Sequence, residues 1–292
     1  MKSPEKQAHS VEKSLQKSAV IDSVRTLSNY TERLEQVAKN MSEYNIKGEI
    51  RDLNPTTANE YLQIRASEVG QKTLDMERQA IQSMLLHVTE KLPQGEKLDV
   101  VKSEYEQVLS SRAYTSEQVS LVSEAQAERN SLSTELAYAA GLRAHELLTL
   151  ARVSEQQADK RPSLESKFSE RQGVIYTVSG KGGLTREVLI PQQLSERLEE
   201  HRLDTPQQVT DRGVHYEQKY NIAGGQKWSN SYSQASNRAL GWSAGAHGLR
   251  HSYAQERMYE LQSSGHERDI ALETVSQELG HFRSEITEIY LR

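Results

Sequence analysis

The stretch Ala-Gly-Ala-His-Gly-Leu-Arg-His-Ser-Tyr-Ala, residues 244–254, carries the clearest indication of fold and function in this chain. A helix that begins after Gly245 would place His247 and Arg250 on its first turn and on one face, because residues three apart lie one above the other. The start of a helix also presents free backbone N–H groups and positive dipole charge, which suit a phosphate. We therefore expect a phosphate-handling site here.

Two further polar side chains follow near the end of the chain. Gly280 is expected to end a short helix, and His281 comes directly after it. In the next helix Ile286, Ile289 and Tyr290 share one face by their spacing. We therefore expect the phenol to point inward with the two isoleucines.

The composition is that of a polar chain that favours helices. The 292 residues suit one large domain or two ordinary ones, and the loop-rich middle favours two. Hydrophobic residues make up 35% of the chain and its mean hydropathy is −0.75, so neither a membrane span nor a leader is expected. The chain has no cysteine, which excludes disulfides and thiolate chemistry and makes a cytoplasmic location the simplest expectation.

The beginning of the chain contains a polar segment followed by an apolar repeat. Residues 1–18 are rich in Lys, Ser and Gln and are expected to be a flexible N-terminus. From Val20 to Met41 the apolar residues follow a heptad rhythm. This rhythm predicts either a coiled-coil partner helix or, as the simpler interpretation, a helix that packs on its own domain.

Further helices complete the first predicted domain. One is expected to begin after Asn54, and another from Thr73. Together the helices predict a small bundle over residues 19–109, and residues 110–114 are expected to be a linker.

Residues 115–292 are expected to form the second domain, opened by a capping box at Thr115. Gly141 would end a helix as a left-handed cap, and a new helix would follow at once. Arg143 then lies at a bend between two buried helices, where Glu146 is close enough to hydrogen-bond it. An arginine beside a glutamate can equally be a structural salt bridge.

After residue 172 the apolar pattern changes from helical to alternating. Residues 173–178 and 184–190 are expected to be strands joined by a glycine-rich turn, with Lys181 at its tip. Glycines around a lysine are a very weak indication of an ATP site here, because the following helix and the Lys-Ser/Thr pair are absent. Thr205 is expected to cap a short helix, and residues 229–240 to form another.

Taken together, these motifs resemble the tyrosine recombinases, the phage integrase family of site-specific DNA strand-exchange enzymes. The resemblance covers residues 115–292 well and residues 54–88 more loosely. It implies a mainly α fold with a small antiparallel β-sheet, in which a helical core-DNA-binding domain precedes an α+β catalytic domain. The motifs are Gly-Leu-Arg-x-x-Glu-Leu-Leu around Arg143, Lys181 at a hairpin turn, His-Gly-Leu-Arg with His247 and Arg250, Leu-Gly-His ending at His281, and Tyr290.

The resemblance implies a covalent mechanism of DNA cleavage and rejoining. Tyr290 would attack a phosphate and form a 3′-phosphotyrosyl bond, so neither a cofactor nor a metal is expected. Arg143 and Arg250 would clamp the non-bridging oxygens with their planar guanidinium groups.

The remaining residues are implied to move protons or to support the clamp. Lys181 would protonate the leaving 5′-oxygen, and His247 would assist proton transfer from the tyrosine. His281 would hydrogen-bond the phosphate, and Glu146 would orient Arg143.

Three other interpretations stay open. His247 and His251 have a spacing found in zinc sites, but the glutamate of His-Glu-x-x-His is absent and no third ligand suggests itself. The same catalytic set also resembles type IB topoisomerases, which relax DNA. A DNA-binding regulator that kept the fold and lost turnover is the third interpretation.

The expected partner is double-stranded DNA, on which the chain would self-associate as a dimer or tetramer within the nucleoid. With 36 Lys and Arg against 41 Asp and Glu, the net charge is −5, whereas DNA-binding domains are usually basic. A basic groove with an acidic back is compatible with this balance, so we expect strong salt sensitivity. The acidic balance also mildly favours the regulator interpretation.

The end of the sequence bears on how copies would assemble. Members of the resembled family usually continue beyond the tyrosine into a segment that docks on a neighbouring copy, whereas this sequence ends at Arg292. We therefore expect either that the chain has been cut or that assembly uses other surfaces, such as residues 20–41. The overall expectation is a two-domain clamp around duplex DNA, encoded by a mobile genetic element.

Overall fold

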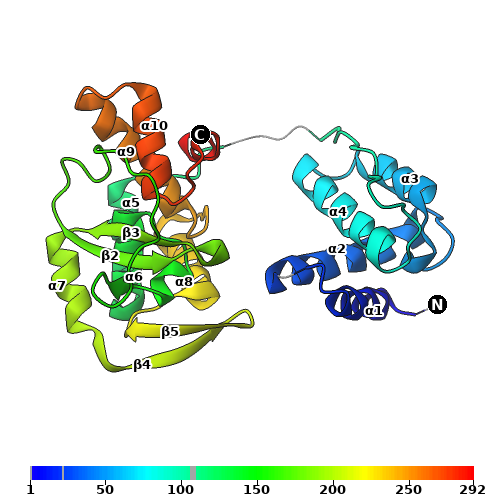
Figure 1. Ribbon diagram of the computed structural model, residues 1–292, viewed down its shortest axis with the longest axis horizontal. Coiled ribbons are helices and arrows are strands. Elements are labelled where there is room, and N and C mark those ends of the chain that lie inside the picture. The colour runs from blue at the N-terminus through cyan, green and yellow to red at the C-terminus, as the bar shows by residue number, and fades with distance from the viewer. Residues whose placement is uncertain (1, 22, 106–109) are drawn as a thin grey trace. The chain divides into compact units, whose positions relative to one another are not determined.

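The computed structural model of the chain describes residues 2–21, 23–105 and 110–292. The chain forms two compact units, Met1–Val108 (unit 1) and Leu109–Arg292 (unit 2) (Figure 1).

Unit 1 is a bundle of helices around one hydrophobic core. Leu34, Tyr61 and Ile81 are among its fully buried side chains. Asn54 and Thr57 form a capping box at the start of the third helix, so the predicted start after Asn54 is observed. The elements are α1 (Pro4–Lys17), α2 (Val24–Glu43), the 3-10 turn η1 (Ile50–Asp52), α3 (Pro55–Arg65) and α4 (Gln71–His87).

Helix α1 corrects the expectation of a flexible segment over residues 1–18. The side chain of Ser3 accepts a hydrogen bond from the backbone N–H three residues on, and proline suits the first helical turn. A stripe of side chains at helical spacing is buried against the bundle, and its members are Gln7, Ala8, Val11 and Leu15. The polar composition of the segment concealed this narrow apolar stripe.

The apolar repeat from Val20 to Met41 packs within its own unit. Helix α2 contacts α1 and α4, and Leu27 and Leu34 lie in the core. Val20 and Val24, at the start of the repeat, are 48% and 56% exposed. The simpler of the two predicted interpretations therefore describes this helix.

Unit 2 combines helices with two antiparallel sheets. Figure 1 shows α9 and α10 at one end of the unit and the β4–β5 hairpin at the other. Its elements are α5 (Ser116–Glu124), α6 (Glu128–Ala140), η2 (Glu146–Leu148), β1 (Ala151–Arg152), β2 (Val174–Ser179), η3 (Lys181–Gly183), β3 (Thr185–Ile190), α7 (Gln192–Glu200), β4 (Arg202–Asp211), β5 (Val214–Tyr220), α8 (Gly225–Leu240), α9 (Gly248–Ser263), α10 (Arg268–Glu278), α11 (Ser284–Thr287) and η4 (Glu288–Leu291).

The three-stranded sheet has the order β1-β2-β3, and the predicted hairpin forms its larger part. Tyr176 lies opposite Val188, and Val178 opposite Arg186. Strand β3 packs against α6 and α10. The sheet thus carries residues of β3 to the interior of the unit, beneath the end of α10.

Three local expectations for unit 2 were wrong. Thr205 lies in strand β4 of a second sheet and not at the start of a helix. The segment after Gly141 forms only the single 3-10 turn η2 and not a full helix. Tyr114, at the end of the expected linker, is 2% exposed and belongs to the core of unit 2.

Within the described residues, no helix is long and apolar enough to cross a membrane.

Candidate active site

The first turn of α9 places Arg250 at the centre of a polar cluster. The side chain is 0% exposed, and its guanidinium donates to the backbone carbonyl oxygens of Gly141 and Leu279. Its Nη2 also lies 3.0 Å from Nε2 of His281. Two segments that are far apart in sequence, one at Gly141 and one from Leu279 to His281, therefore hold one guanidinium group.

The two carbonyl groups come from the ends of helices. Gly141 ends α6 in the left-handed conformation, with φ 59°, and Leu279 ends α10. The last carbonyls of a helix have no partner within it and carry partial negative charge, so they attract a cation. A Cβ at Gly141 would lie 2.8 Å from Leu279, so only glycine allows the helix ends to meet this closely.

Glu146 joins a second and a third guanidinium to the cluster. Its Oε1 accepts from Arg143 Nη1 at 2.8 Å, and its Oε2 accepts from the Arg143 backbone N–H and from Arg186 Nη2, each at 2.8 Å. The same Oε2 lies 3.9 Å from Arg250 Nη1. The predicted hydrogen bond between Arg143 and Glu146 is therefore present, within a larger network.

This network keeps the Glu146 carboxylate ionised although it is 0% exposed. Burial alone would raise the pKa of Glu146, but the positive charges of Arg186, Arg250 and Arg143 outweigh it and hold the pKa well below its usual range. For Arg250, burial and Arg143 lower the pKa of the guanidinium, while Glu146 opposes them. The cluster has more positive than negative groups, which is suited to an anion.

Tyr290 lies inside the same cluster, as expected from its place in the last helical segment. The side chain is 8% exposed, and the centre of its ring lies 5.1 Å from the ring of His281 and 5.4 Å from that of His247. The guanidinium carbon of Arg250 is 5.6 Å from the same ring centre. The ring of Tyr290 thus covers the guanidinium of Arg250 on one side.

The backbone around Tyr290 is fixed by α9. Gln255 Nε2 donates to the carbonyl oxygens of Tyr290 and Arg292, at 3.1 and 2.9 Å. The expected inward pair of isoleucines was wrong, because Ile289 is 47% exposed and Ile286 only half-buried. The tyrosine is therefore held by polar contacts and by the rings of the cluster.

The histidines of the cluster are neutral at neutral pH. Burial lowers the pKa of His281 to about 3, and Arg250 acts in the same direction. Burial and then Arg112 lower the pKa of His251 to about 4, against a hydrogen bond to the backbone of Tyr290. His247 is partly open to solvent, and the partial burial of its ring, followed by the charge of Arg250, lowers its pKa. A neutral imidazole can accept a hydrogen bond, but a pKa this low makes it a weak base, and the negative charge of a bound phosphate would raise that pKa.

Lys181 is the predicted residue whose side chain lies outside the described structure. Its backbone forms part of η3, in the turn between β2 and β3. A Cβ on the neighbouring Gly180 would lie 3.4 Å from Glu146 Oε1 and 3.9 Å from Arg143 Nη1. The turn that carries Lys181 therefore runs directly beside the cluster.

Two residues of the cluster were not predicted as members. His251 is 5% exposed and its ring centre lies 4.8 Å from that of Tyr290. It lies four residues after His247, so both histidines are on one face of the helix. In the sequence this spacing indicated only a zinc pattern, and the described residues contain no group of His, Cys, Asp and Glu side chains that could hold a metal. Arg186 gave no signal, because a charged residue in an alternating strand normally faces solvent.

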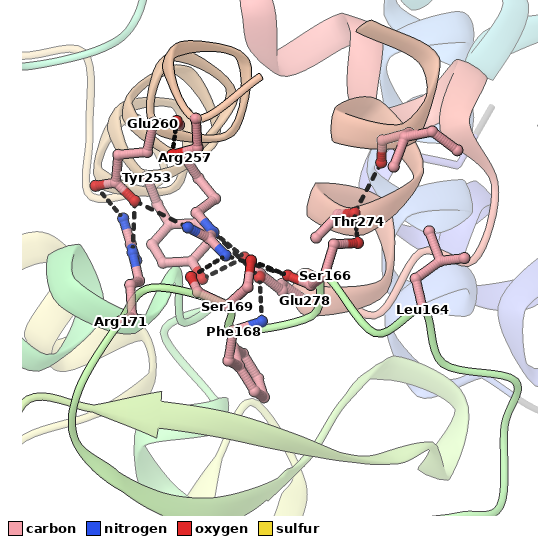
Figure 2. Close-up of polar contacts among 12 residues, drawn as sticks. Leu164, Ser166, Phe168, Ser169, Arg171, Tyr253, Arg257, Glu260, Thr274 and Glu278 are labelled. Atoms are coloured by element: carbon pink, nitrogen blue, oxygen red, sulfur yellow. Dashed lines mark hydrogen bonds and ion pairs between the residues drawn. The ribbon is translucent and has the colours of Figure 1, made fainter. Parts of the chain in front are cut away.

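A second polar network, centred on Glu278, holds the end of α10 (Figure 2). The side chain of Glu278, 1% exposed, accepts from Tyr253 Oη and from the Phe168 backbone N–H, both at 2.8 Å. Arg257 Nε lies 3.2 Å from each oxygen of the same carboxylate. This network fixes the turn that follows α10, and with it His281.

Comparisons with known proteins agree with this architecture. No family model and no curated protein sequence matches the chain. A lambda integrase tetramer bound to a Holliday junction superposes with a TM-score of 0.61 at 16% identity, covering 98% of this chain and 76% of that one.

Two further solved structures are similar. The Tn1549 transposon integrase in complex with transposon right end DNA gives a TM-score of 0.55 at 13% identity, covering 100% of this chain and 95% of that one. The XerH site-specific recombinase bound to its difH substrate gives 0.53 at 17% identity, covering 91% and 75%. These proteins are tyrosine recombinases, and the chain has their fold, mainly helical with small antiparallel sheets.

Proposed function

We propose that this protein cleaves and rejoins DNA at specific sites through a covalent bond between Tyr290 and a 3′-phosphate. The observation that carries the proposal is the convergence of Tyr290, Arg250 and His281 from the last 43 residues of the sequence with Arg143 and Glu146 from the middle. The fold shared with recombinases supports the reaction class.

In the proposed reaction the phenol oxygen of Tyr290 attacks the phosphorus, and the bond from phosphorus to the 5′-oxygen breaks. The phenol proton passes to the imidazole of His247, whose ring centre lies 5.4 Å from that of Tyr290, and Lys181 gives a proton to the 5′-oxygen. Arg143 and Arg250 stabilise the extra negative charge on the non-bridging oxygens. Rejoining reverses these steps with a 5′-hydroxyl as the nucleophile.

One rearrangement must precede this reaction. Arg250 is 0% exposed beneath the ring of Tyr290, so a phosphate reaches it only after the ring moves aside. The contacts that have to change are the ring stacking on His281 and the hydrogen bonds from Gln255. We infer that DNA binding supplies the free energy for this movement.

The proposed partners are duplex DNA and further copies of the chain. Among similar solved structures, lambda integrase is described as a dimer bound to a core site and as a tetramer bound to a Holliday junction, which supports assembly on DNA. Integration or excision of a mobile element would be the biological setting.

A trapping experiment tests the nucleophile. A pool of duplexes with random sequence and one nicked strand would be incubated with the protein, and adducts that survive denaturation would be sequenced. We expect adducts with the natural chain and none with Tyr290→Phe. Tyr259→Phe is the matched control, because Tyr259 lies on α9 and is 75% exposed. Equal trapping by both variants would show that another group forms the bond.

The same experiment separates the second candidate function, a DNA-binding regulator without turnover. The covered Arg250 and the net charge of −5 favour it. A regulator would protect a DNA site from nuclease yet form no adduct with any duplex.

A further inference from the structure

Arg186 is a buried cation for which the proposed reaction has no use so far. It lies on β3, opposite Val178, and is 3% exposed. Arginine at such a position is costly unless its donors are paired. The contacts of the Arg186 guanidinium therefore indicate its role.

The guanidinium of Arg186 bridges the two halves of the active-site cluster. Nη2 donates to Oε2 of Glu146 at 2.8 Å, and Nη1 donates to the carbonyl oxygen of Glu278 at 2.5 Å. Glu146 holds Arg143, while the residue after Glu278 holds Arg250 through its carbonyl. One side chain thus links the supports of both phosphate-binding arginines.

The fit around Arg186 is close. Gly280, with φ +71°, lies directly against it, and a Cβ there would be 2.5 Å from Cδ of Arg186. Gly280 is followed by His281, so the arginine also supports the backbone from which that imidazole projects. Nε of Arg186 has no hydrogen-bond partner among the described residues.

We propose that Arg186 is a positioning residue that balances the charge of Glu146, so that Arg143 and Arg250 keep their places and their charge for the phosphate. This inference rests on the proposed function. Glu146 Oε2 is shared between Arg186 at 2.8 Å and Arg250 at 3.9 Å. Without Arg186, the buried carboxylate draws Arg250 into a direct ion pair, which turns the guanidinium away from its carbonyl partners and cancels part of its charge.

The test compares four variants with the natural chain: Arg186→Lys, Arg186→Met, Glu146→Gln and the double variant Glu146→Gln/Arg186→Met. Arg197→Met is the control for loss of an ion pair, because Nη1 of Arg197, on α7, donates to Glu135 Oε2 at 2.6 Å, outside both the cluster and the network around Glu278. The readouts are DNA affinity, the single-turnover rate of adduct formation, and the affinity for inorganic phosphate from NMR signals of the arginine side chains. For the phosphate titration Tyr290→Ala is added to every chain, so that the ring no longer lies over Arg250.

We expect Arg186→Met to lower the rate of adduct formation about 100-fold, the order of effect of a lost transition-state contact, with DNA affinity changed less than about 3-fold. Arg186→Lys should retain most of the rate, since it keeps the charge. The double variant should be at least about 10-fold faster than Arg186→Met, because the excess carboxylate charge is gone. A purely structural role predicts instead that the double variant is no faster than Arg186→Met, and this result overturns the inference.

Phosphate binding keeps this inference separate from the proposed function. If the natural chain and the Arg197 variant form no adduct, the proposed function fails, and the phosphate titration still decides the role of Arg186. Weaker phosphate binding in Arg186→Met with recovery in the double variant supports it. Equal phosphate affinity with Arg186 and with Met at this position contradicts it, and Arg186→Gln, which also lacks the charge, carries this test if the Met variant does not fold.

Discussion

A guanidinium group removed from water needs acceptors for its N–H groups, and Arg250 finds them in the carbonyls of two helix ends. The planar fork reaches both at once, while the single ammonium of a lysine is a compact charge on a flexible stem. At the scale of a residue, the candidate site therefore depends on the shape of this side chain as well as its charge.

We predict that Arg250→Lys lowers the single-turnover rate of adduct formation by about 10²- to 10³-fold, as for other lost transition-state donors. The free energy of unfolding in urea should fall by about 1–3 kcal/mol, because buried carbonyl groups lose partners. Arg238→Lys is the control, since Arg238 also donates to a helix-end carbonyl, that of Ala125 at 3.0 Å, but is exposed. Similar rate losses in both variants would contradict the prediction.

The buried His251 predicts a dependence of stability on acid. Its pKa in the folded state is about 4, below the value of about 6.5 expected for an unfolded chain. Between these values the unfolded state binds a proton that the folded state does not, so stability is complete above pH 6.5 and falls as the pH drops toward 4. We expect His251→Gln to unfold with a shallower dependence on pH over this window, measured by urea unfolding.

The control for the loss of one imidazole is His266→Gln, in the turn between α9 and α10. A natural chain whose stability rises from pH 6.5 to 4 would have the opposite sign and would contradict the assignment. The His251 variant should also alter the fluorescence of the neighbouring Tyr290.

Individual residues of the cluster differ in how far the sequence reveals them. Arg250, His281 and Tyr290 follow from motif order, and the structure brings these three together. Arg186 could not be predicted, because its burial depends on β3 packing under α10, a contact between segments far apart in sequence. The spacing of His251 from His247 places both on one helix face, but no motif in the sequence indicates a catalytic role for His251.

At the scale of elements, the meeting of α6 with α10 depends on one glycine. Gly141→Ala would force a left-handed conformation on alanine and bring Cβ to 2.8 Å from Leu279 and 2.9 Å from Tyr253. We expect a loss of about 1–3 kcal/mol in the free energy of unfolding, the usual cost of such strain, and slower adduct formation through the displaced carbonyl. Gly241→Ala is the control, since Gly241 ends α8 at φ 78° with nothing within 4 Å of a Cβ.

Gly241→Ala should cost stability through backbone strain alone and leave adduct formation unchanged. An equal effect of both substitutions on the rate would show that the α6 end does not position Arg250.

The helices and strands show which elements can be predicted from neighbouring residues alone. The helix start after Asn54 was predicted from an asparagine cap followed by proline, and the start after Thr115 from a capping box, and these signals act within four residues. Strand β4 was mistaken for a helix start at Thr205, because the pairing that makes it a strand joins it to β5 across a turn. Its register shifts between Arg202 and Gln207, a stretch that includes Pro206, and an irregularity is where a strand accommodates a residue without an N–H.

At the scale of the whole molecule, each unit has a core of its own. Unit 1 packs around one hydrophobic cluster, and unit 2 around clusters that include Tyr114 and Leu272. We predict that the fragment of residues 110–292 folds alone, with one cooperative thermal transition, but binds DNA more weakly than the full chain. Calorimetry and gel-shift titration measure the two effects.

The matched fragment of residues 116–292 lacks Tyr114, whose ring stacks on Trp242 at 5.1 Å and whose backbone bonds Ser252. It should melt at a lower temperature than the longer fragment. Identical melting of both would mean that Tyr114 does not belong to the core of this unit.

The covering of Arg250 by Tyr290 has a consequence for the idle protein in a cell. Cells are full of nucleotides, sugar phosphates and other small anions, and an open cationic pocket would be occupied by them for most of its lifetime. Here the ring of Tyr290, the proposed nucleophile, itself lies over the guanidinium of Arg250. Small metabolites cannot supply the many contacts of a long duplex. Under the proposed function they would leave the ring over Arg250, and the phenol would react only with DNA.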